Sequence, residues 1–310
     1  MPSDPRFDEI ASEIQNGVNS AQYDVFGRQD ALKHLEQGGI RAAMYYSRID
    51  RAISRQDVLP FVTMLKSIGR VDKLDLIIVS PGGDGTAAET MLGLCRRYCI
   101  GHLRVVVPTY AKSAATLIAL GADEIVMGES SELGPIDAQV SIMQDNAEQQ
   151  VSADHFIRAK NEAIKNLTSA DQAEAQAAQI QLALLSPAFL QHCQDSMQFG
   201  RDFAMKQLKG HMFKAEREAQ PALWDDRIDK IVSNLTASSK HLTHGRMITA
   251  DDIRDDSDLK HLKVTAKGKR RPLLDCLKRP STENGDRFPD ARDRKGPLCK
   301  GLSDAWGLGA

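Results

Sequence analysis

Short apolar runs alternate with helical patterns between residues 75 and 127, and this alternation constrains the fold more than any other feature. Apolar, β-branched runs of this length are typical of buried strands, and the segments between them carry apolar residues at helical spacing. This order predicts parallel strands joined by right-handed crossovers, and hence an α/β fold. The expected strands are 75–80, 104–108 and 124–127, and the expected helices are 86–98 and 113–120.

The segments on either side of this core extend the same domain. A short strand at 41–46 and a helix at 57–68 precede the core, and a weak strand at 261–264 follows it. Strands and helices that alternate in this way share one sheet, so we expect one domain from 41 to 264.

A helical insertion is predicted from about 153 to 239, where the chain is rich in Ala, Gln, Lys and Glu at helical spacing. Ser186-Pro187 is expected to separate two of its helices. The first 40 residues read as a helical or loose segment. Residues 265–310 begin with the basic run 267–271 and are dominated by Gly, Pro and charges, which predicts a mobile tail.

Bulk composition argues against several classes of function. The 310 residues carry a net charge of −2, so no charge excess points to a nucleic-acid partner. No apolar run approaches the roughly 20 residues that span a bilayer, and the first residues do not resemble a signal peptide. These features predict a cytoplasmic protein with no membrane span.

Cysteines and metal-binding patterns give no sign of a cofactor. The five cysteines are odd in number and scattered, which predicts buried, inert thiols rather than a disulfide framework. No spacing of His, Cys, Asp or Glu is typical of a metal site, so we expect no metal.

A glycine turn follows the first core strand, in Ser80-Pro81-Gly82-Gly83. Glycines allow a sharp turn and leave backbone N–H groups uncovered, and the next helix directs its positive end to the same place. Such a turn suits an oxyanion. The alternative is a plain tight connection between a strand and a helix.

A serine turn follows the second core strand, in Tyr110-Ala111-Lys112-Ser113-Ala114. A serine hydroxyl becomes a nucleophile when a base takes its proton and backbone donors hold the developing oxyanion. The N–H of Ala114 could be one such donor, although a serine at a helix start is often only an N-cap. Both turns lie at the carboxyl ends of parallel strands, where α/β sheets place ligands, so neighbouring strands would bring them face to face.

The motifs around these turns resemble the serine dehydrogenase proteinase family. The resemblance rests on PGG at 81–83, on VPTYAKSAATLIALGADEIVM at 107–127 and on ELGPIDAQV at 132–140. A later stretch, LTHGRMITADDI at 242–253, is similar to the family's WTHDYPITPEEA, with Gly245 in place of its aspartate. The family is related to signal peptide peptidase A and to the proteolytic subunit of Clp protease. The resemblance therefore implies a Clp/crotonase-like spiral of βαβ units.

This resemblance also implies a function. A member would be a serine-type peptidase that acts on peptides or proteins, with Ser113 as nucleophile and an oxyanion hole from Gly82 or Gly83 and Ala114. It would assemble into homo-oligomers, and an ATPase or adaptor is a further candidate partner. The word dehydrogenase in the family name refers to a substrate, so no nicotinamide cofactor is expected.

The general base is left open by the sequence. The region that holds the histidine of the Clp subunit contains Asp137 here, which could close a turn or face the substrate. Lys160 and Lys165 occupy the region that supplies the lysine of signal peptide peptidase A, and a desolvated lysine can act as a base. His244 is the third candidate, because its imidazole could titrate near neutral pH.

Two other functions are compatible with the same motifs. The chain could be an inactive oligomeric scaffold or partner-binding module of this fold, because no base is evident. It could also be a crotonase-type acyl-CoA enzyme, which would use the paired amides on a thioester. The serine in YAKSAAT argues against the second alternative.

Overall fold

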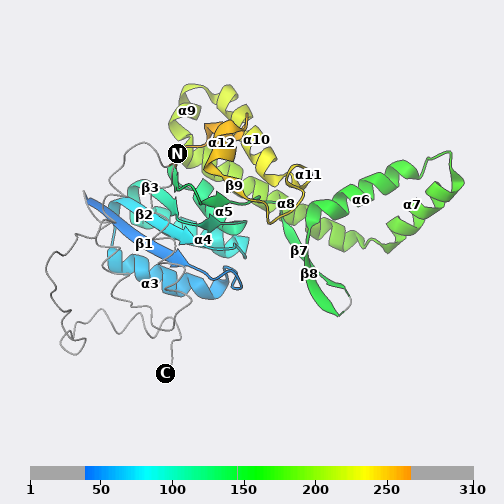
Figure 1. Ribbon diagram of the computed structural model, residues 1–310, viewed down its shortest axis with the longest axis horizontal. Helices are drawn as coiled ribbons and strands as arrows, with labels where there is room; N and C mark the ends of the chain where they lie inside the picture. The colour runs from blue at the N-terminus through cyan, green and yellow to red at the C-terminus, as the bar shows by residue number, and fades with distance from the viewer. Residues whose placement is uncertain (1–38, 145, 267–310) are drawn as a thin grey trace.

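A parallel sheet forms the centre of the fold. The computed structural model describes residues 39–144 and 146–266, and Figure 1 shows this sheet at one side with a helical hairpin extending away from it. Its strand order is β1-β2-β3-β5-β10, and every pairing is parallel. The predicted α/β class is therefore confirmed. The strands are β1 (Ile40–Tyr46), β2 (Val71–Val79), β3 (Cys99–Val107), β5 (Glu124–Met127) and β10 (Val264–Ala266).

The main core lies on one face of this sheet. Alternate residues of β2, Leu74, Leu76 and Ile78, are buried there together with apolar residues of the covering helices. These helices include α3 (Val58–Ile68), α4 (Gly85–Tyr98) and α5 (Ala114–Leu120), and η2 (Arg55–Asp57) directly precedes α3. All seven residues of α5 are buried, which fixes the start of this helix firmly against the sheet.

A second, small sheet lies beside the first. It contains β4 (Tyr110–Ala111), β6 (Glu132–Leu133) and β9 (Ile248–Thr249), in the order β4-β6-β9. β4 and β6 are parallel, and β6 and β9 are antiparallel. A bridge between Ser80 and Ala111 links β4 to the end of β2, so the two sheets meet at the carboxyl ends of the core strands.

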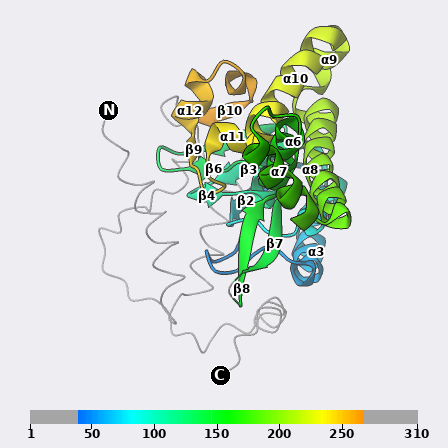
Figure 2. The same ribbon diagram turned by 90° about the vertical axis from the view of Figure 1, so that its right-hand side faces the viewer.

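A β-hairpin, which the sequence did not predict, precedes the helical insertion. The antiparallel strands β7 (Gln139–Gln144) and β8 (Ala147–Ser152) project from the body, as Figure 2 shows. They precede α6 (Ala153–Asn166) and α7 (Gln172–Leu184), and the break before α8 (Pro187–Gln207) confirms the separation predicted at Ser186-Pro187. The remaining elements are η3 (Leu208–Met212), α9 (Lys214–Ala219), α10 (Pro221–Thr236), α11 (Ser238–His241) and α12 (Ala250–Asp255).

The last strand does not lie where the sequence predicted it. Part of 261–264 belongs to η4 (Leu259–His261), where buried Leu259 and Leu262 anchor a turn, and the strand is β10. Its pairing with β5 carries the sheet beyond residue 264, so the expected domain end falls inside a strand. The expected N-terminal segment up to residue 38 and the tail from 267 lie outside the described residues.

The described residues contain no helix long and apolar enough to cross a membrane, and no group of His, Cys, Asp and Glu side chains placed to hold a metal ion. Cys95, Cys99 and Cys193 are free and buried. Burial raises the pKa of the Cys95 thiol to about 12, so this thiol stays protonated at neutral pH. Cys276 and Cys299 lie outside the described residues.

Candidate active site

Ser113 has a backbone conformation that is rare for a residue with a side chain. It stands between β4 and α5 with φ 48° and ψ −118°. Such a conformation costs on the order of 1–3 kcal/mol and persists only where the surroundings impose it. Here the Ser80 N–H donates to Tyr110 O and the Lys112 N–H donates to Ser80 O, both at 3.0 Å. The hydroxyl does not cap α5, so Ser113 is not an ordinary N-cap.

The glycine turn touches the serine turn. Gly82 is buried and has φ 97°. A Cβ atom on Gly82 would lie 2.6 Å from Lys112 O, 2.7 Å from Ser113 Cβ and 3.0 Å from Ala114 N. Only glycine fits such a space without a shift of the serine turn. The two turns therefore face one another, as the predicted order of neighbouring strands requires.

Two backbone N–H groups at this contact are free. The Gly82 N–H donates to Ser80 Oγ at 3.1 Å. Gly83 is exposed, and Ile53 pairs with its neighbours instead: the Ile53 N–H donates to Gly82 O and the Asp84 N–H donates to Ile53 O. Among the hydrogen bonds of the described residues, none involves the N–H of Gly83 or of Ala114. These two amides can donate a hydrogen bond to an incoming oxyanion without breaking another.

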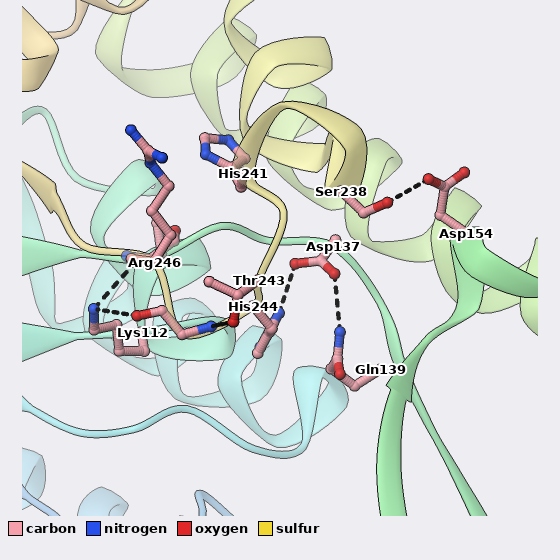
Figure 3. A network of polar contacts seen from close by, with 12 residues as sticks. Lys112, Asp137, Gln139, Asp154, Ser238, His241, Thr243, His244 and Arg246 are labelled. Carbon is pink, nitrogen blue, oxygen red and sulfur yellow. Dashed lines mark hydrogen bonds and ion pairs between the residues drawn. The ribbon is translucent and has the colours of Figure 1, made fainter.

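Asp137 and His244 form a close pair, although they are 107 residues apart in sequence. His244 Nδ1 lies 2.6 Å from Asp137 Oδ1, and the Gln139 side chain donates to Asp137 Oδ2 at 2.9 Å (Figure 3). The Asp137 side chain is 3% exposed and that of His244 is 26% exposed. Burial alone would raise the pKa of Asp137, but the hydrogen bond and charge of His244 lower it below its usual range.

This contact orients the imidazole. An ionised carboxylate beside Nδ1 holds the proton on that nitrogen, which leaves Nε2 as the free acceptor. The pair thus supplies a proton acceptor whose partner carboxylate is buried and charged.

The small sheet gathers the three segments that carry Ser113, Asp137 and His244. Ser113 follows β4, Asp137 follows β6 by a short turn, and His244 precedes β9. Thr116 fixes the turn after β6, because its hydroxyl donates to Ala111 O at 2.6 Å and accepts from the Gly134 N–H at 3.1 Å. No hydrogen bond between Ser113 Oγ and His244 is found among the described residues, and such bonds often tighten only when a substrate is bound.

The two candidate lysines lie elsewhere. Lys160 and Lys165 are on α6, which packs against α7 and α8 and extends away from the sheet (Figure 1). Lys165 is exposed and Lys160 is half-buried, and neither ammonium has an ion pair or hydrogen bond among the described residues. The structure does not bring either lysine to the serine turn.

Lys112 and His241 are neighbours of the site that the sequence did not single out as functional. Lys112 contacts the loop that carries His244. His241 is buried, its Nε2 lies 2.8 Å from Asn234 O, and burial lowers its pKa. Lys112 directly precedes Ser113, and His241 directly precedes the motif at 242–253. Nothing in the sequence indicates which way their side chains point.

A cavity borders Asp137. It has a volume of about 360 Å³ and lies between the segment after β6 and helices α6 and α8. Asp137 forms part of its wall. Its apolar lining comes from Ile136, Ala138, Ile157 and Met197.

A protein-family model described as a ClpP-like SDH-type serine proteinase matches residues 44–195. The match includes both turns, Ser113 and Asp137, and ends before His244. Residues 44–195 belong to this serine proteinase family. The parallel central sheet agrees with the ClpP-like fold that membership implies.

Curated relatives share part of the chain. Two uncharacterized proteins of Methanocaldococcus jannaschii are similar to it. One is 31% identical over 132 residues, which cover 43% of this chain and 42% of that protein. The other is 42% identical over 67 residues, which cover 22% of this chain and 23% of that protein. The chain thus spans less than half the length of these relatives.

Solved structures are similar only at low TM-scores. A mutant of the 1510-N membrane-bound stomatin-specific protease has a TM-score of 0.31 and 13% identity, and the match covers 74% of this chain and 98% of that chain. A second mutant of that protease, in complex with a substrate peptide, has a TM-score of 0.30 and 16% identity, covering 52% and 72%. Such scores are too low to transfer the role of any residue.

Proposed function

We propose that this protein is a serine peptidase that hydrolyses peptide bonds through an acyl-enzyme on Ser113. His244 is the general base, Asp137 orients it, and the amides of Ala114 and the Gly82-Gly83 turn form the oxyanion hole. The observation that carries the proposal is the contact between His244 and the buried Asp137, in segments that flank the same small sheet as the strained, uncapped Ser113. Membership of a serine proteinase family supports it.

The chemistry follows from these positions. Ser113 Oγ attacks the carbonyl carbon while His244 Nε2 takes the hydroxyl proton, and the carbonyl oxygen becomes an oxyanion held by backbone N–H groups. Collapse breaks the C–N bond, and the imidazolium returns its proton to the departing amine. Water then attacks the ester while His244 Nε2 takes its proton, which releases the acid and restores Ser113.

The cavity beside Asp137 supports a peptide substrate. A peptide carries a side chain next to the carbonyl that is attacked, and a space of about 360 Å³ lined by apolar and by polar side chains can take one. The homo-oligomer, an ATPase or adaptor partner and the cytoplasmic location stay predictions.

Intact-mass analysis after treatment with a fluorophosphonate tests the nucleophile. Wild type should gain one adduct and Ser113→Ala none, whereas Ser67→Ala, a serine on α3 away from both turns, should label like wild type. His244→Ala should slow labelling by about 10²–10⁴-fold, the usual worth of a general base. Lys160→Ala and Lys165→Ala should label at the wild-type rate.

The same experiment separates the alternatives. An unlabelled wild type that still forms oligomers would contradict the peptidase and favour a scaffold. Binding of coenzyme A that is indifferent to Ser113→Ala would instead favour an acyl-CoA enzyme. If Lys165→Ala or Lys160→Ala abolishes labelling while His244→Ala does not, the assignment of the base is wrong.

A further inference from the structure

The loop that carries His244 has few attachments. Residues 242–247 connect α11 to β9, and all of them are exposed except His244, which is half-buried. Two hydrogen bonds lie within the loop, from the N–H groups of Gly245 and Arg246 to Thr243. Among the described residues, the loop is held to the rest of the fold at only two places between its ends, His244–Asp137 and the side chain of Lys112.

Lys112 reaches three acceptors. Its Nζ donates to Gly245 O at 3.4 Å and to Arg246 O at 3.3 Å, and forms an ion pair with Glu132 Oε2 at 3.1 Å. Figure 3 shows the ammonium beneath the loop, on the side away from Asp137. The Lys112 side chain is 14% exposed, so this ammonium is committed to protein partners rather than to water.

These contacts connect the nucleophile and the base. Lys112 is the residue before Ser113, Glu132 lies in β6, and the two carbonyls belong to the residues after His244. We propose that Lys112 is a positioning residue, whose ammonium ties the His244 loop to the strand end that carries Ser113. This inference rests on the proposed function, because it assigns Lys112 a role in that same site.

Misplacement of a catalytic group explains the size of the expected effect. A shift of about 1 Å in a reacting group can cost roughly 10²-fold in rate, even when the change lies outside the chemistry. A loop released from Lys112 would keep its contact with Asp137 but lose the second anchor that fixes its distance from Ser113. The turnover number should therefore fall, while binding of the substrate should change little.

Substitution of Lys112 requires a control for the charge of Glu132. Its Oε2 is buried and has no hydrogen-bond partner among the described residues, so the Lys112 ion pair is its compensation. Lys112→Met alone leaves an uncompensated carboxylate and could destabilise the fold. The double variant Lys112→Met/Glu132→Gln removes that charge as well. It should regain thermal stability without regaining turnover.

Lys112→Arg separates positioning from catalysis. Arginine can donate to the same carbonyls and to Glu132, but it cannot lose a proton and so cannot act as a base. We expect Lys112→Arg to keep kcat within about tenfold of wild type, and both methionine variants to lose about 10–100-fold in kcat with little change in KM. A Lys112→Arg protein as inactive as Lys112→Met would overturn the inference, since a guanidinium keeps the charge and the donors on which positioning depends.

Trypsin measures the loop independently of activity. Arg246 lies in the loop, and release from Lys112 should speed cleavage after it, whereas cleavage after Arg254 on α12 serves as the internal control. The comparison uses Ser113→Ala protein with and without Lys112→Met/Glu132→Gln, which excludes self-cleavage. Equal rates after Arg246 would overturn the inference. If the wild type has no peptidase activity, but trypsin still cleaves after Arg246 faster when Lys112→Met/Glu132→Gln is present, the proposed function is wrong. The role of Lys112 in holding the loop would then still stand.

Discussion

Gly82→Ala tests whether the glycine and serine turns touch. The added Cβ would lie 2.6 Å from Lys112 O and 2.7 Å from Ser113 Cβ, and these atoms belong to a segment fixed on both sides. The backbone at φ 97° adds strain of about 1–3 kcal/mol for any residue other than glycine. Overpacking in a close-packed region costs about 1–3 kcal/mol more. We therefore expect a loss of about 2–6 kcal/mol in the free energy of unfolding.

Gly93→Ala is the matched control. Gly93 lies inside α4, and a Cβ there would meet nothing within 4 Å. That substitution should stabilise the helix by about 0.5–1 kcal/mol. Urea unfolding and the rate of fluorophosphonate labelling would be measured for both variants. Gly82→Ala should label at least about 10²-fold more slowly, because the relaxation that makes room for the methyl group moves the oxyanion donors.

One result would refute this reasoning. If Gly82→Ala unfolds and labels like wild type, Gly82 does not pack against Ser113 and the oxyanion hole lies elsewhere. If Gly82→Ala is destabilised but labels at the normal rate, Gly82 packs against the serine turn, but the glycine turn does not contribute to the oxyanion hole.

Three further outcomes follow from the site and its surroundings. Asp137→Asn should lower kcat by about 10³–10⁴-fold while the fold stays intact by circular dichroism, since the imidazole loses the charge that fixes its tautomer; a loss below tenfold would contradict the pair. Met197→Trp narrows the cavity and should raise KM for substrates with large apolar side chains more than for alanine substrates, and an equal change would exclude the cavity from binding. Burial would raise the pKa of Asp137 and of Asp256, but His244 lowers the pKa of Asp137 and Lys240 lowers that of Asp256. The ionised carboxylates therefore stabilise the fold above the unfolded pKa of about 4. This stability is lost as the pH falls from about 4 toward the lower pKa values of the folded state. The urea concentration at the midpoint of unfolding should therefore decrease as the pH is lowered below about 4. This decrease should be smaller in Asp256→Asn.

Much of the core could be predicted because its signals are local. The run at 75–80 is apolar and β-branched and stops at Pro81, and the strand β2 ends at Val79. The glycines after it are required by a contact that the sequence implied, since parallel neighbouring strands bring their carboxyl ends together. Periodicity and turn chemistry carry this information without any knowledge of distant residues.

The rest of the site depends on contacts that no local pattern encodes. The strands β4, β6 and β9 have two residues each, too few for an alternating pattern to show. The hairpin of β7 and β8 is rich in glutamine and has an exposed second strand, so it lacks the apolar run that marks a strand. The lysines of α6 are candidates because they occupy the region that supplies the lysine of signal peptide peptidase A, whereas His244 reaches Asp137 across 107 residues.

The strongest reason to regard Ser113 as more than an N-cap comes from another serine in the same chain. Ser186 also precedes a helix, and it behaves as an N-cap should: φ is −66°, ψ is 124°, and its side chain accepts from the Phe189 N–H. Ser113 has φ 48° and makes no such bond. A serine needed only to end a helix would adopt the unstrained geometry of Ser186 and gain the capping bond. The strain at Ser113 instead keeps the hydroxyl off the backbone of α5, and the Ala114 N–H next to it is also free, which is the arrangement that a nucleophile beside an oxyanion hole requires.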